Sequence, residues 1–98
     1  PFPNPANPEI WIPYHLREDY NVEVRILNMK GDVVRSLELG QQKSGIYVNR
    51  NGLYNAAHWD GRNNLGEDIA SGVYFYQVVG KGINGLNKVG EGKFVINR

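Results

Sequence analysis

The chain has no cysteine and no threonine, and it lacks any long apolar run. Without cysteine it can form no disulfide, no thiolate zinc site and no cysteine nucleophile, and its redox compartment stays undetermined. No stretch approaches the roughly 18 apolar residues of a membrane span, and no charged-then-apolar signal peptide opens the sequence. The sequence therefore predicts no membrane span.

The chain also lacks an excess of positive or negative charge, because it has 11 Lys and Arg and 10 Asp and Glu, for a formal net charge of +1. The basic residues are scattered and form no stripe interleaved with aromatics, so we expect no nucleic-acid partner. With 98 residues and 41% apolar side chains, the chain has material for one domain with a small core.

The sequence does contain apolar residues that alternate with a period of two between frequent turn residues. This pattern predicts about seven short strands and no helix, which is typical of an all-β antiparallel sandwich. Pro13 lies inside the first apolar run and predicts an edge or bulged strand there. The expected strands are residues 10–16, 22–27, 33–39, 46–48, 57–59, 73–79 and 89–97.

The first eight residues, with four prolines, differ in composition from the rest of the chain. Proline removes a backbone donor and favours extended neighbours, so this stretch is stiff and cannot nucleate a helix. We interpret residues 1–8 as a proline-rich linker and residues 9–98 as the domain. Because the sequence starts at Pro1 and not at Met, we expect it to be part of a larger protein.

Two loop motifs invite ligand-binding interpretations. Residues 80–85 match G-x-G-x-x-G, but no helix can follow and the chain ends at Arg98, so a flexible hairpin loop is expected. Residues 60–68 are rich in oxygen ligands, but position 3 of a calcium loop would be Arg62 and position 6 Leu65. An Asx turn at Asp60 is the favoured interpretation, and we expect no metal and no cofactor.

Groups suited to catalysis are few: the histidines are His15 and His58, and the serines are Ser36, Ser44 and Ser71. No strained G-x-S-x-G turn presents a nucleophile. A domain of this size also has little material for a cleft between paired carboxylates. The sequence therefore predicts no catalytic residues and a protein that is not an enzyme.

Aromatic residues carry the clearest alternative. An exposed row of Trp11, Tyr14 and Tyr54 would suit a carbohydrate- or surface-binding module, since aromatic rings stack on sugars. Packing in the core is the other interpretation, and it is left open for Trp11 and Tyr54. A second group, which we expect to lie in the core, comprises Trp59, Tyr74 and Tyr76.

Five segments resemble, in order and spacing, the immunoglobulin-like domain named after the flagellar hook-capping protein FlgD. They also resemble the related C-terminal sorting domains of bacterial type IX secretion cargo. The resemblance implies an Ig- or fibronectin-III-like sandwich at the end of a larger secreted or cell-surface protein. The five segments are Asn4–Glu9, Ile26–Arg35, Trp59–Asn63, Ala70–Tyr76 and Lys93–Ile96.

The resemblance further implies a non-catalytic C-terminal module that sorts, anchors or supports its parent protein. The implied partners are an upstream domain of the same polypeptide and secretion machinery or a cell-surface component. We expect the last strand to supply the contact surface through its edge, with Phe94, Ile96 and Arg98 as candidate residues. The family commonly has Phe where Ala6 stands, so anchoring of the first residues on the domain is expected to be weak. Tyr74 is a candidate for a tyrosine-corner hydrogen bond.

Overall fold

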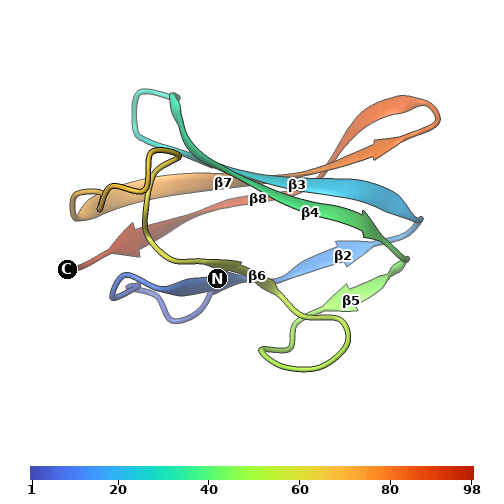
Figure 1. Ribbon diagram of the computed structural model, residues 1–98, viewed down its shortest axis with the longest axis horizontal. Helices are drawn as coiled ribbons and strands as arrows, with labels where there is room; N and C mark the ends of the chain where they lie inside the picture. The colour runs from blue at the N-terminus through green and yellow to red at the C-terminus, as the bar shows by residue number, and fades with distance from the viewer.

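The computed structural model, which describes residues 1–98, places antiparallel strands in two facing layers (Figure 1). One layer is a four-stranded sheet in the order β4-β3-β7-β8. The other layer contains two short pairs, β1 with β6 and β2 with β5. The predicted all-β sandwich is confirmed, and the structure contains no helix long enough to cross a membrane. The strands are β1 (Ile10–Ile12), β2 (Tyr14–Leu16), β3 (Tyr20–Leu27), β4 (Val33–Gln42), β5 (Gly45–Tyr47), β6 (Ala57–Trp59), β7 (Gly72–Gly82) and β8 (Gly85–Ile96).

The sequence predicts one edge or bulged strand over residues 10–16, and the structure divides it at Pro13 into β1 and β2, each in a two-stranded pair. Proline has no N–H to give to a ladder, so the run changes partner at this residue. Before Pro13 the chain pairs with β6, and after it the chain pairs with β5. One sequence segment thereby supplies a strand to both pairs of the second layer.

The hairpin of β7 and β8 is longer than the sequence predicts. The sequence predicts a flexible hairpin loop over residues 80–85, but β7 continues to Gly82 and β8 begins at Gly85. The glycines have a packing role, because a Cβ on Gly80 would lie 2.6 Å from the ring of Tyr20. The expected connection is therefore wrong, and only residues 83 and 84 form the turn.

The core lies between the layers and is centred on Trp59, which is fully buried. The rings of Tyr74 and Phe94 meet Trp59 edge-on, with centroids 6.3 and 5.8 Å away. Edge-to-face packing of this kind stabilises aromatic clusters beyond the area that they bury. The Tyr74 hydroxyl donates a 2.8 Å hydrogen bond to the carbonyl of Ala70, which confirms the predicted tyrosine corner.

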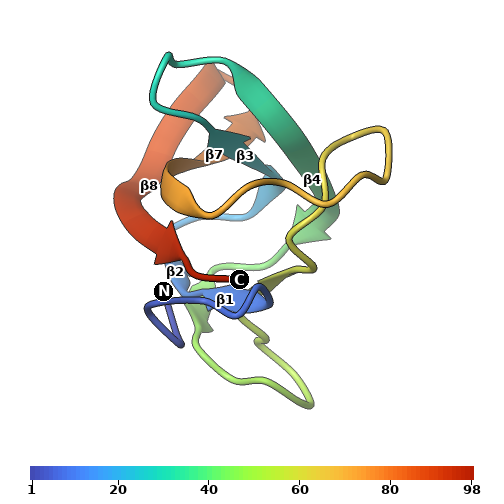
Figure 2. The ribbon, with the colours of Figure 1, turned by 90° about the vertical axis from the view of Figure 1, so that its left-hand side faces the viewer.

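Residues 1–8 lie against the domain. The backbone N–H groups of Phe2 and Trp11 each donate to the other's carbonyl, at 2.9 and 2.8 Å. Four residues on, Ala6 forms a parallel bridge with Ile96, and its side chain is fully buried. The weak anchoring expected at Ala6 is therefore wrong: a methyl group fits the space against β8. Figure 2 shows the first residues beside the end of β8.

Candidate functional site

The N-terminal segment, residues 2–6, closes one side of the sandwich. Phe2 pairs with β1 in one layer, and Ala6 pairs with β8 in the other. The Ala6 N–H donates to Val95 O at 2.7 Å, and the Asn97 N–H donates to Ala6 O at 2.8 Å. In addition, the Val95 N–H donates to Oδ1 of Asn4. Both layers are thereby joined by hydrogen bonds through the same few residues.

The opposite edge of the four-stranded sheet is covered in a comparable way by Asn64. Its N–H donates to Val34 O at 2.9 Å, and its side-chain oxygen accepts from the Ser36 N–H at 3.0 Å. An edge strand with free donors and acceptors is a template for unwanted pairing. Each edge of this sheet is thus covered by a non-strand segment over part of its length.

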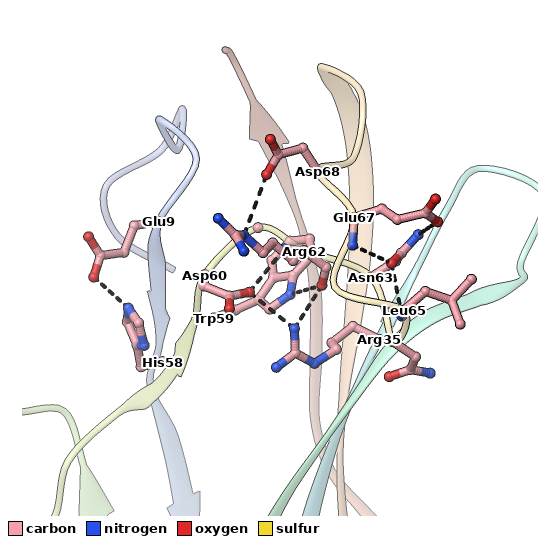
Figure 3. A network of polar contacts seen from close by, with 12 residues as sticks. Glu9, Arg35, His58, Trp59, Asp60, Arg62, Asn63, Leu65, Glu67 and Asp68 are labelled. Carbon is pink, nitrogen blue, oxygen red and sulfur yellow. Dashed lines mark hydrogen bonds and ion pairs between the residues drawn. The ribbon is translucent and has the colours of Figure 1, made fainter.

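The loop that carries Asn64 is ordered by side-chain to backbone hydrogen bonds (Figure 3). Oδ1 of Asn63 accepts from the N–H groups of Leu65 and Glu67, both at 2.9 Å. Oδ1 of Asp60 accepts from the N–H of Arg62 at 3.0 Å. These bonds confirm the Asx turn predicted at Asp60, which is how short polar side chains stabilise turns.

Arginines pair with the two aspartates of this loop. Arg35 donates to Oδ1 of Asp60 at 3.1 Å, while Arg62 and Arg98 lie 3.5 and 3.6 Å from Oδ1 of Asp68. Burial acts to raise the pKa of Asp60, but the Arg62 N–H and the Arg35 guanidinium outweigh it and the pKa is lowered. No group of three or more His, Cys, Asp or Glu side chains is placed to hold a metal ion. The ion pair between Arg35 and Asp60 therefore links the loop to β4.

Trp11 is enclosed by neighbours on the outer surface of the second layer. The Arg50 guanidinium lies 4.3 Å from its ring centroid and 5.3 Å from that of Phe2. The His58 ring lies 4.9 Å from Trp11, and His58 Nε2 is 2.5 Å from Oε1 of Glu9 (Figure 3). A sugar stacks on a free aromatic face, whereas Arg50 occupies that place here. This cluster holds Phe2 on the domain.

Tyr14 and Tyr54 take part in a second aromatic cluster. Tyr14 stacks on Tyr47 with centroids 4.6 Å apart, and both side chains are buried. Burial raises the pKa of both Tyr14 and Tyr47. The Tyr47 hydroxyl adds to the rise at Tyr14, and Tyr54 and Asp19 add to the rise at Tyr47. Tyr54 is 44% exposed, has a positive φ of 61° and packs edge-on against Tyr47. Tyr54 alone of these presents substantial surface to solvent.

The six candidate contact residues do not form one surface. Phe94 and Ile96 are each only 1% exposed, so the expectation that they contact a partner is wrong: alternation along β8 turns them into the core. Arg98 is directed back onto the domain, donating to the carbonyls of Ile69 and Gly61. Sequence reasoning missed Phe2 and Arg50, because nothing in their spacing shows that both lie on Trp11.

The sequence pattern of FlgD Ig-like domains matches residues 14–82 of this chain. Among solved structures, FlgD from P. aeruginosa superposes with a TM-score of 0.71 at 24% sequence identity. The similar region covers 89% of this chain and 61% of that one, so this chain corresponds to only part of the longer protein. At this identity the likeness establishes a shared fold. None of the curated proteins matches the chain.

Proposed function

Because this chain belongs to the FlgD Ig-like domain family, we propose that it is a non-catalytic module that supports and anchors a larger secreted or cell-surface bacterial protein. In this proposal its first partner is the upstream domain of the same polypeptide. Its role is to hold that domain at a fixed orientation. We further propose that secretion machinery recognises the module and thereby sorts the parent protein.

The seating of the N-terminal segment is the observation that supports this role. Phe2 is bonded to one layer and Ala6 to the other, so the entering chain has little freedom relative to the sandwich. Pro8 adds to this by packing on Gly61, where a Cβ would lie 2.7 Å from the Cβ of Pro8. A segment that contacts the sandwich at three points fixes the orientation of the upstream domain relative to it, whereas a flexible linker does not.

A fusion protein tests the anchoring role. A small rigid domain is joined directly ahead of Pro1, and the rotational correlation time of each domain is measured by nuclear magnetic resonance relaxation. We expect both domains to tumble as one body. A matched fusion carrying Ala6→Glu should tumble as two, because the charged side chain cannot occupy the buried position. Independent tumbling of the unmodified fusion would contradict the proposal.

A secretion assay tests the sorting role separately. A reporter enzyme is joined ahead of Pro1 and expressed in a bacterium that has type IX secretion, with the reporter alone as control. We expect the fusion outside the cell and the reporter alone inside it. Truncation of β8 is a poor variant, because it removes the core residues Phe94 and Ile96. Retention of the fusion inside the cell would overturn the sorting role. It would not affect the anchoring role, which the tumbling experiment tests separately.

A further inference from the structure

We propose that the open part of the β8 edge binds an extended acidic segment of a partner protein, which adds a strand beside Glu91–Phe94 and continues into the groove between β8 and β2. The inference goes beyond the proposed anchoring role and does not depend on it. It rests on the backbone of β8, on the shape and charge of the groove, and on the way the N-terminal segment already occupies the neighbouring part of the same edge.

The backbone of β8 offers unpaired groups along this edge. The N–H and C=O of Val95 are directed away from β7, because they bond to Asn4 and Ala6. Backbone direction alternates with a period of two, so the groups of Lys93 and Glu91 have the same direction. Neither residue makes a backbone hydrogen bond outside the strand ladder. The outward N–H and C=O groups of Lys93 and Glu91 are therefore free, next to the part of the edge that the N-terminal segment covers.

A groove continues from this edge. It has a volume of about 390 Å³ and is lined by His15 of β2, by Arg17 just after β2, and by Asn87, Lys88 and Val89 of β8. Tyr20 forms its floor: the ring crosses Gly80 of β7, and its hydroxyl accepts a 3.2 Å hydrogen bond from Asn87 Nδ2. An extended chain placed beside β8 would enter this groove between the layers, as residues 2–6 do further along.

The charges at the groove favour an acidic occupant. Arg17 forms no ion pair, and no carboxylate lines the groove. Lys88 also lies there, paired at 2.9 Å with Glu91, and Lys93 on the open edge has no ion-pair partner. The nearby Glu18 carboxylate accepts from the Tyr20 hydroxyl. Opposite charges give specificity to a strand added by backbone hydrogen bonds.

The open edge lacks the usual protection against an added strand. Gly90 and Gly92 alternate with Glu91 and Lys93, and the ring of Tyr76 lies 2.8 Å from where a Cβ on Gly92 would be. Natural edge strands use proline, charges and covering segments to prevent pairing. Here the covering segment reaches only Val95 to Asn97, and the backbone of the rest of the edge makes no hydrogen bond outside the strand ladder.

Peptide binding to the isotopically labelled chain tests the proposal. The probes are an eight-residue peptide of alternating threonine and glutamate and a matched peptide of alternating threonine and lysine. We expect the acidic peptide to bind at least about tenfold more tightly, with shifts and slowed hydrogen exchange at the amides of Glu91 and Lys93. Binding of neither peptide at millimolar concentration, or equal binding of both, would overturn the proposal.

Three variants locate the site. Lys93→Pro removes the outward N–H but leaves the hydrogen bonds to β7, so it should abolish binding of the acidic peptide. Lys93→Ala keeps the N–H and should weaken binding only about two- to threefold. If Lys93→Pro fails to fold, Arg17→Glu decides, because charge reversal in the groove should weaken acidic-peptide binding about tenfold or more. Lys30→Glu, an equal charge change on the exposed β3–β4 turn, should leave it unchanged. Undiminished binding to folded Lys93→Pro or to Arg17→Glu would contradict strand addition at this edge.

Discussion

Ala6 is bonded to β8 as a strand would be: it forms a parallel bridge with Ile96, and its N–H and C=O reach the residues on either side of Ile96. Ile96 is itself a core residue, only 1% exposed. The entry of the chain and its last strand therefore belong to one packed unit.

Replacing Ala6 by Glu should detach the N-terminal segment. The position is fully buried, and an unpaired carboxylate there loses its hydration without compensation. Because the segment can leave the surface, the loss is limited to its own contacts, and we expect about 1–3 kcal/mol of unfolding free energy. Denaturant titration measures this. Ala70→Glu, at an exposed alanine, should change stability by less than about 0.5 kcal/mol.

Gly80 should tolerate no side chain while Tyr20 remains in place. A Cβ would lie 2.6 Å from the Tyr20 ring, so the ring or β7 must shift, and Gly80→Ala should cost about 1–3 kcal/mol. Gly90→Ala is the matched control, since its nearest neighbour would be Val78 at 3.8 Å. A double-mutant cycle with Tyr20→Leu should show coupling between the two positions. Equal stability of the two alanine variants would contradict the packing described.

Tyr14 and Tyr47 should make the domain sensitive to alkaline conditions. Burial raises the pKa of both hydroxyls above the unfolded value, so the folded state holds their protons more tightly. The resulting stability is complete below the unfolded pKa of about 10 and is lost as the pH rises above it. Tyr14→Phe should make this loss shallower in denaturant titrations at pH 9 and pH 11. An unchanged pH dependence would contradict burial as the cause.

Asp60 should give the opposite pH dependence. Its pKa is lowered in the folded state, so its contribution is present above the unfolded pKa of about 3.9 and is lost as the pH falls through the folded value. Because the side chain is 48% exposed, Asp60→Asn should cost no more than about 1 kcal/mol at pH 7. The variant and the parent should converge in stability near pH 2. A difference that persists there would point to the turn, and not to the charge.

The strands and most of the core could be predicted from the sequence because alternation reports burial directly. Trp59 and Tyr74 lie in the core as predicted, and Tyr76 is partly buried against it. Phe94 and Ile96 alternate with the exposed Lys93 and Val95 and lie in the core, whereas the resemblance to sorting domains led us to expect them as contacts. Consistent patterns within a strand are the stronger guide to burial.

The N-terminal segment could not be predicted in the same way. Its prolines indicate stiffness, and stiffness is compatible both with a free linker and with a segment seated on an edge. The hydrogen bonds of Ala6 join residues about 90 positions apart in the chain, and no local pattern reports such a contact. The groove beside Arg17 was missed for the same reason, since β2 and β8 meet only in the folded structure.

Backbone order parameters of residues 2–8 test the central claim most directly. If the segment is part of the folded domain and holds what precedes it, nitrogen-15 relaxation should give order parameters of about 0.85 at Phe2 and Ala6, equal to those of β8. Ala6→Glu should lower the values for this segment and leave β3 and β7 unchanged. Order parameters below about 0.6 at Phe2 and Ala6 in the unmodified chain would describe a free linker and contradict the claim.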